Sequence, residues 1–278
     1  VVTSSLSLGT IFSCAATSTG GVKCWGYGYD GQLGNGLTPS YQYTPVNVLM
    51  SPSSAALSGV SAIASGYYQS CALTTAGGVK CWGYNSEGEL GNGSTTRQTT
   101  AVDVHTSSSS STAISGVSAI ALGGQHSCAL TTTGGVKCWG DNASGQLGDG
   151  STTDRTTPVD VTGLTNVSAI ALGGDHSCAL ITGGSVKCWG SNYFGQLGNG
   201  STTNRTTPDN VNGLTSGVAA IALGESHSCA LTTTGGVKCW GRGDYGQLGN
   251  GFGTDRSTPV DVSVSGFSFG VDTTAPTF

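Results

Sequence analysis

One segment recurs five times in this chain and constrains its fold more than any other feature. Each copy contains a cysteine, nine further residues, a second cysteine and the dipeptide Trp-Gly. The copies use all ten cysteines and all five tryptophans of the 278 residues. Their first cysteines follow one another at intervals of 57, 57, 50 and 51 residues, at Cys14, Cys71, Cys128, Cys178 and Cys229. A repeat of this length is in the range of propeller blades rather than of helical hairpins.

The third copy shows the internal pattern most clearly. Short β-rich runs at 117–122, 126–131, 136–140 and 159–161 are separated by glycine, asparagine, aspartate and proline. No stretch is long or periodic enough for a helix. The 47 glycines and the charged fraction of only 9% also argue against a helical solenoid. The sequence therefore predicts an all-β chain with four strands in each copy.

The spacing of the two cysteines matches a tight β-hairpin. If Cys128 faces Cys138 across antiparallel strands, Leu130 faces Val136 and a three-residue loop ends at Gly134. Such loops favour a residue with positive φ at the third position, where glycine is least strained. The same register places a glycine there in every copy, at Gly20, Gly77, Gly134, Gly184 and Gly235.

This register also predicts one disulfide in each hairpin, since it puts both sulfurs on one face of adjacent strands. Zinc binding is the alternative, but short Cys-x2-Cys pairs and histidines at fixed offsets are missing. Five disulfides indicate an oxidising compartment, which means a secreted or cell-surface protein. The predicted pairs are Cys14–Cys24, Cys71–Cys81, Cys128–Cys138, Cys178–Cys188 and Cys229–Cys239.

The repeat resembles that of the RCC1 (regulator of chromosome condensation) family in its bacterial extracellular form. The matching pieces in the third copy are Gly-Gly-x-His-Ser-Cys-Ala-Leu, Gly-Val-Lys-Cys-Trp-Gly, Gly-Gln-Leu-Gly and Pro-Val-Asp-Val, at 123–130, 135–140, 145–148 and 158–161. Kelch and WD40 repeats are also propeller units, but the Trp-Gly and Gly-Gln-Leu-Gly pieces fit neither of their patterns. The resemblance extends from Leu6 to about Val262 and implies a β-propeller of four-stranded antiparallel blades around a central channel.

The domain organisation follows from the copies. We expect one propeller over 1–265, with 266–278 as a linker toward a following domain. Relatives of this kind usually close with seven blades, whereas five are present here. We expect these five to close one ring by themselves, and the alternative is that further blades or neighbouring molecules complete it. Extra residues at 49–57 and 107–111 predict flexible surface loops between blades. The expected repeats are 1–57, 58–114, 115–164, 165–215 and 216–265.

The charge pattern argues against nucleic-acid binding. The net charge is −5 and the pI is about 5.1. Nine of the ten basic residues recur at two positions of the repeat, so they fit blade-edge or solvated roles better than a phosphate-binding stripe. An acidic protein with paired cysteines is also ill suited to the work of eukaryotic relatives on a small GTPase and chromatin.

No catalytic or metal site is expected, and no cofactor. Asp175, His176 and Ser177 follow one another, but neighbouring side chains on a strand point to opposite faces and cannot form a triad. The histidine position of the repeat holds Phe12 and Gln69 in the first two copies, which favours packing or hydrogen bonding over general-base catalysis. The alternating oxygen ligands of a calcium loop are missing.

Specific binding is expected where the copies differ. The residues between Trp-Gly and Gly-Gln-Leu-Gly vary from copy to copy. In the second copy, Tyr67 and Tyr68 stand where the third copy has Gly124 and Gln125. Aromatic side chains with scattered acids and an arginine are typical of recognition surfaces, although they could also simply cover blade edges. The candidate partner-binding residues are Tyr27, Tyr29, Tyr67, Tyr68, Tyr84, Tyr193, Phe194, Arg242 and Tyr245.

These patterns predict a non-catalytic, secreted or cell-surface scaffold for protein interactions. The alternatives are a lectin-like propeller with several similar glycan sites, which would gain from avidity, and a proteinaceous inhibitor of an extracellular enzyme. The expected partners are a protein or glycan at the cell exterior or other copies of the chain. No apolar run approaches the length of a membrane span.

Overall fold

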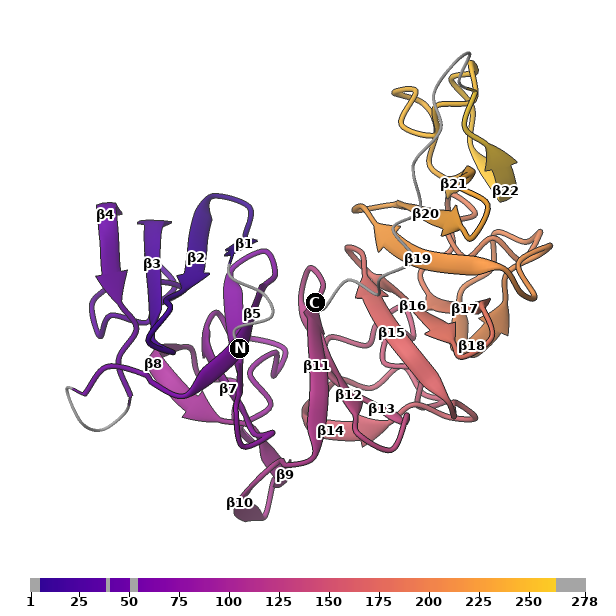
Figure 1. The fold of residues 1–278 in the computed structure, drawn as a ribbon. Helices are drawn as coiled ribbons and strands as arrows, with labels where there is room; N and C mark the ends of the chain where they lie inside the picture. Colours follow the sequence, from indigo (N-terminus) through magenta and orange to yellow (C-terminus); the bar gives the residue numbers. More distant parts are fainter. Residues whose placement is uncertain (1–5, 39–40, 51–54, 264–278) are drawn as a thin grey trace.

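The computed structural model describes residues 6–38, 41–50 and 55–263, and all regular structure in these residues is β-strand. The strands form five four-stranded antiparallel sheets and one two-stranded hairpin. Figure 1 shows the five sheets as successive blades of a propeller. The predicted all-β propeller of four-stranded blades is confirmed. The expected linker at 266–278 lies outside the described residues.

Each blade uses four strands that are consecutive in sequence. Blade 1 contains β1 (Leu6–Leu8), β2 (Phe12–Ala16), β3 (Val22–Tyr27) and β4 (Tyr41–Asn47). Blade 2 contains β5 (Val60–Ser65), β6 (Gln69–Thr74), β7 (Val79–Gly83) and β8 (Gln98–Asp103). Blade 3 contains β11 (Val117–Leu122), β12 (His126–Thr131), β13 (Val136–Gly140) and β14 (Arg155–Asp160).

The last two blades repeat the order of blade 3. Blade 4 contains β15 (Val167–Leu172), β16 (His176–Ile181), β17 (Ser185–Gly190) and β18 (Arg205–Asn210). Blade 5 contains β19 (Val218–Leu223), β20 (His227–Thr232), β21 (Val237–Gly241) and β22 (Arg256–Asp261). The first strand of each blade lies nearest the channel, because the turns after these strands line a shared cavity.

The central hairpin of each blade has the predicted register. Cys128 pairs with Cys138 and Leu130 with Val136 across β12 and β13. Gly134 ends the loop with φ of 80°, and the matching glycines of the other blades also have positive φ. All five predicted disulfides are formed, and no cysteine is free. Each could stabilise the fold by about 2–3 kcal/mol through chain entropy.

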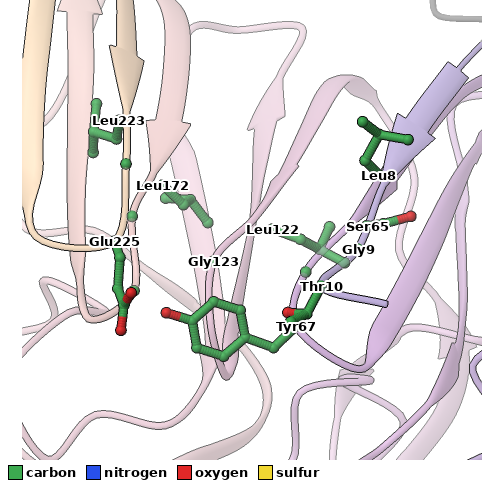
Figure 2. Close-up of a pocket in the computed structure, with 14 residues that line it drawn as sticks. Leu8, Gly9, Thr10, Ser65, Tyr67, Leu122, Gly123, Leu172, Leu223 and Glu225 are labelled. Atoms are coloured by element: carbon green, nitrogen blue, oxygen red, sulfur yellow. The ribbon is translucent and has the colours of Figure 1, made fainter. Parts of the chain in front are cut away.

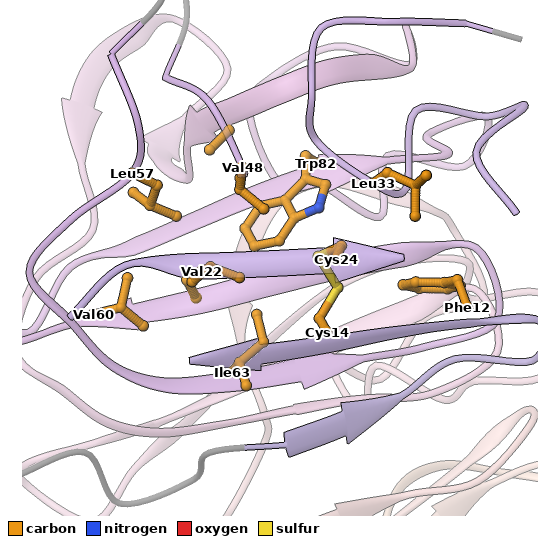
Figure 3. Close-up of a cluster of buried hydrophobic side chains, with 12 residues drawn as sticks. Phe12, Cys14, Val22, Cys24, Leu33, Val48, Leu57, Val60, Ile63 and Trp82 are labelled. Atoms are coloured by element: carbon orange, nitrogen blue, oxygen red, sulfur yellow. A yellow bond between two sulfur atoms is a disulfide. The ribbon is translucent and has the colours of Figure 1, made fainter. Parts of the chain in front are cut away.

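The core lies between consecutive blades rather than inside each one. Four buried clusters each combine the disulfide hairpin of one blade with a tryptophan of the next. Figure 3 shows the first, where Trp82 of blade 2 lies over Cys14–Cys24 and Leu33 of blade 1. We call this contact the tryptophan joint. Trp82, Trp139, Trp189 and Trp240 are fully buried, whereas Trp25 of blade 1 is partly exposed.

A glycine makes each tryptophan joint possible. The indole Nε1 of Trp189 donates to the backbone oxygen of Gln146 at 2.9 Å. A Cβ on Gly148 would lie 2.7 Å from the same Nε1, and this glycine has φ of 72°. Any larger residue would therefore meet both a steric clash and backbone strain. The equivalent indole bonds end on the backbone oxygens of Gln32, Glu89 and Gln196. The Gly-Gln-Leu-Gly segment of one blade thus packs against the tryptophan of the next blade and accepts its indole hydrogen bond.

The expected closure of five blades into one ring is not observed in the described part of the chain. Extensive strand contacts join only blades that are adjacent in sequence. Figure 1 shows blade 5 standing apart from blade 1, so the blades form an open arc. The physical reason lies in the joints, because the tryptophan of blade 1, Trp25, is partly exposed and is not covered by another blade as the other four are.

In their described parts, both extra segments contain paired strands or bridges where flexible loops were expected. A two-stranded hairpin, β9 (His105–Ser107) and β10 (Ser110–Ala113), takes up the serine-rich tract. In the other segment, Leu49 pairs with Ala56 and Leu57 is buried in the first core cluster. Leu57 and Met50 of this segment pack in the first tryptophan joint, which sequence composition alone does not reveal.

Candidate interaction surface at the channel mouth

The two variable positions of the repeat lie side by side in every blade. The residue after Trp-Gly donates its backbone N–H to the residue that precedes the histidine position. In blade 4, Ser191 bonds Asp175 at 2.8 Å, and in blade 5, Arg242 bonds Ser226 at 2.9 Å. The equivalent pairs are Tyr27–Ile11, Tyr84–Tyr68 and Asp141–Gln125. The residues that differ between copies therefore gather at one end of the blades, around the mouth of the channel.

A tyrosine cluster covers this end of blades 1 and 2. The rings of Tyr27 and Tyr29 stack with centroids 5.1 Å apart, and Tyr41 meets both edge-on. Tyr68 meets Tyr84 edge-on at 6.4 Å. Burial together with Asp30 and the neighbouring tyrosines, Tyr68 among them, raises the pKa of Tyr27, which links the two groups. Sequence analysis missed Tyr41 because it lies on β4, away from the variable positions.

A second aromatic cluster covers blades 4 and 5. The guanidinium of Arg242 lies 5.0 Å from the ring centroid of Phe194 and 4.9 Å from that of Tyr245. Asp244 accepts two bonds of 2.8 Å from the same guanidinium, and this pairing raises the pKa of Arg242. Tyr193 meets Phe194 edge-on. Tyr193 and Tyr245 are 77% and 80% exposed, so their rings are available to a partner.

Tyr67 lies between the two clusters, in the channel itself. Figure 2 shows its ring reaching from blade 2 toward Glu225 of blade 5. The hydroxyl of Tyr67 faces the side chain of Glu225 (Figure 2). Burial, Glu225 and Asp175 raise the pKa of Tyr67 to about 12, so the phenol is protonated at neutral pH.

The channel mouth is acidic and lacks basic partners. The pKa of Asp175 is raised by burial, Asp141 and Glu225. The pKa of Asp141 is raised by burial and by Asp154 and Glu87, against opposing hydrogen bonds. Among the described residues, the ion pairs involve none of Asp141, Asp175 or Glu225.

Most of the repeated basic residues pair within their own blades instead, whereas Arg97 of blade 2 reaches Asp30 of blade 1 at 3.7 Å. Lys80, Lys137 and Lys238 reach Asp103, Asp160 and Asp261 of the outer strands at 2.6–2.7 Å. The remaining two lysines, Lys23 and Lys187, reach asparagine oxygens at the same place. The arginines of blades 3 and 4 pair with aspartates of their own blades. This arrangement agrees with the blade-edge role predicted for them.

The recurring histidines serve the joints between blades. His126 and His176 are fully buried, and burial lowers the pKa of each to about 3. Nε2 of His126 lies 2.9 Å from Oγ of Ser177, which in turn donates to the backbone oxygen of Gln146. Because the serine proton is used, Nε2 of the neutral ring must donate. His176, by contrast, contacts Ser228, so Asp175, His176 and Ser177 do not form a triad.

Sequence analysis also missed Glu89, which occupies the glutamine position of the Gly-Gln-Leu-Gly segment in blade 2. Its side chain is fully buried, and burial raises its pKa to about 7. Oε2 accepts a bond from the backbone N–H of Glu87, whereas Oε1 has no partner. The available signal was the single Glu among four glutamines, Gln32, Gln146, Gln196 and Gln247.

Neither a metal site nor a membrane helix emerges from residues 6–38, 41–50 and 55–263. These ranges hold no group of three or more His, Cys, Asp or Glu side chains arranged to bind a metal ion. They also hold no helix of the length and apolarity needed to cross a membrane.

The blades, their disulfide hairpins and their tryptophan joints define a β-propeller of RCC1 type. The family model of the RCC1-like domain matches residues 1–275, and the chain belongs to this family. This membership agrees with the resemblance seen in the repeat.

Relatives and solved structures agree with the family. The chain is 32% identical over 202 residues to "Probable E3 ubiquitin-protein ligase HERC4" of Homo sapiens, covering 72% of this chain and 14% of that protein. It is 32% identical over 248 residues to the ultraviolet-B receptor UVR8 of Arabidopsis thaliana, covering 87% of this chain and 53% of that protein. This chain thus spans about half or less of the length of these two relatives.

Among the similar solved structures, two crystal structures illustrate the shared fold. Human WBSCR16 superposes with a TM-score of 0.76 at 25% identity, covering 93% of this chain and 66% of that one. Yeast RCC1 (Prp20), solved with Kap60 bound, gives a TM-score of 0.75 at 23% identity, covering 92% and 60%.

Proposed function

We propose that the protein is a non-catalytic scaffold at the cell exterior that binds a partner protein through the channel mouth. The observation that carries this proposal is the pair of aromatic clusters, which occupy the positions where the copies differ. Exposed tyrosines supply a large contact area at a small entropy cost, and Arg242 is held ready by Asp244.

Two further observations support the proposal. Five disulfides are consistent with an oxidising compartment outside the cytosol. Yeast RCC1, whose fold is similar, is bound to Kap60 in its crystal structure, so a propeller of this type can carry a protein partner. The recurring histidines of blades 3 and 4 are buried and contact serines of the next blade.

The test compares partner capture by two forms of the chain. The immobilised protein is exposed to the extracellular fraction of its source, and bound proteins are identified by mass spectrometry. A variant with Tyr29→Ser, Tyr193→Ser and Tyr245→Ser should lose the partner, because these rings form the exposed contact area. Tyr43→Ser is the matched control, since Tyr43 is 91% exposed but has no ring contact with either cluster. Equal capture by all forms would contradict the proposal.

Glycan binding is the second candidate, and the exposed tyrosines also favour it, because aromatic faces can stack on sugar rings. A glycan array decides between the two. Binding that depends on the same three tyrosines, without capture of any protein, would favour a lectin-like propeller. Inhibition of an extracellular enzyme would instead appear as a captured hydrolase whose activity falls.

A further inference from the structure

The channel of the propeller contains a cavity that combines an apolar wall with an acidic mouth. Its volume is about 240 Å³, and the turns after the inner strands of all five blades line it. We propose that this cavity binds one arginine side chain of a partner protein. This inference rests on the proposed function, because it names the chemistry by which the partner is recognised.

The wall of the cavity suits the aliphatic part of an arginine. Leu122, Leu172 and Leu223 end the inner strands of blades 3, 4 and 5 and line the cavity together, as Figure 2 shows. All three remain partly exposed, and Leu8 of blade 1 is 66% exposed. Arginine can bury its methylene groups on such a surface while its charged end stays at the mouth.

The mouth of the cavity suits the guanidinium. Glu225 lines the cavity, and Asp175 follows the lining residue Gly174. Among the described residues, the carboxylates of Asp175 and Glu225 take part in none of the ion pairs, and the hydroxyl of Tyr67 faces Glu225 (Figure 2). Besides burial, repulsion from Asp141 and Glu225 raises the pKa of Asp175, and a bound cation would relieve this repulsion.

Tyr67 supplies an aromatic face beside the carboxylates. A Cβ on Gly124 would lie 2.9 Å from Cε2 of Tyr67, and a Cβ on Gly174 would lie 3.1 Å from its hydroxyl. The ring is therefore held against two glycines, in one orientation. A planar guanidinium can stack on a tyrosine and bond two carboxylates, which an ammonium cannot do equally well.

The size of the cavity and its single occurrence fix the kind of ligand. Typical small-molecule sites measure roughly 300–1,000 Å³, so this cavity is better matched to one side chain. The equivalents of Tyr67 are Thr10, Gly124, Gly174 and Glu225, so the tyrosine and the glutamate each occur once. The site arises from differences between copies and is not repeated around the channel.

The test uses the peptide acetyl-Gly-Gly-Arg-Gly-Gly-amide with the whole chain labelled with ¹⁵N. We expect amide shifts of Gly174, Glu225 and Tyr67 that saturate with peptide concentration. The same peptide with citrulline, which is uncharged but has the same shape, should leave these amides unchanged. Shifts that are equal for both peptides, or that lie on other blades' outer strands, would overturn the inference.

Two variants and a control locate the charge. The double variant Glu225→Gln, Asp175→Asn should bind the arginine peptide about fivefold or more weakly, as expected for exposed charge pairs. The control Asp103→Asn changes an exposed carboxylate that pairs with Lys80 on the outer strand, and it should bind like the wild type. Tyr67→Phe keeps the ring and removes the hydroxyl that faces Glu225 (Figure 2), so its affinity should be equal or higher. A double variant that binds normally while remaining folded would refute the site.

This experiment separates the inference from the proposed function. If the partner is captured through the rim tyrosines but the arginine peptide does not bind, only the inference fails. If the peptide binds but capture is unaffected by the tyrosine changes, the proposed function fails.

Discussion

Replacing Glu89 by glutamine should stabilise the protein above neutral pH and have little effect below about pH 4.5. The pKa of Glu89 rises from 4.5 to about 7 because its carboxyl is buried and Oε1 has no donor. A folded-state pKa above the unfolded one means that the native state holds the proton more tightly. The resulting stability is full below pH 4.5 and is lost as the pH rises through 7.

The size of the effect follows from the shift. Each pKa unit corresponds to 1.36 kcal/mol, so the loss approaches about 3 kcal/mol at pH 9. Glu89→Gln removes this titration, and its amide oxygen can still accept the bond from Glu87 N–H. For a chain of this size the gain in Tm would be about 5–10 °C at pH 9. At pH 4 the difference should be small.

Differential scanning calorimetry at pH 4, 7 and 9 measures this effect. The reciprocal change Gln146→Glu places a second carboxyl beside Asp141, to which Gln146 Nε2 now donates at 2.7 Å. It should destabilise the protein, and more so at high pH. A Tm difference between wild type and Glu89→Gln that is the same at pH 4 and pH 9 would refute the reasoning.

The remaining predictions concern the tryptophan joint between blades 3 and 4 and the disulfide of blade 3. Gly148→Ala should destabilise the protein by about 2–4 kcal/mol in urea unfolding, because its Cβ would meet Trp189. Gly163→Ala is the matched control: its φ of 70° is similar but no atom lies within 4 Å, so a loss as large as that of Gly148→Ala would exclude the clash as the cause. The double change Cys128→Ala, Cys138→Ala should lower the free energy of unfolding by about 2–3 kcal/mol. Unchanged stability would contradict the stabilising role of this disulfide.

The hairpins could be predicted from the sequence because they depend on local geometry. The distance between Cys128 and Cys138 and the glycine at 134 leave one register that satisfies both. The four strands per blade could be predicted from the glycine, asparagine, aspartate and proline residues that separate the short β-rich runs. Repetition strengthened each of these predictions, since five copies had to obey one rule.

The relation between blades could not be predicted in the same way. Whether five blades close depends on an angle set by packing at each tryptophan joint, and no single residue encodes it. The buried state of Glu89 also depends on the neighbouring blade, whose Trp139 and Ser127 both bond its backbone oxygen. The variable residues were recognisable as candidates, but the clustering of Tyr41 with them required the path of β4.

The placement of the tryptophans makes the protein its own optical probe. Four of the five indoles are enclosed only because an adjacent blade covers them, while Trp25 remains partly in contact with solvent. Intrinsic fluorescence therefore reports on the tryptophan joints between blades. A blade that detaches while its disulfide-bonded sheet stays folded would expose a tryptophan and shift the fluorescence emission to the red. The circular dichroism spectrum would hardly change.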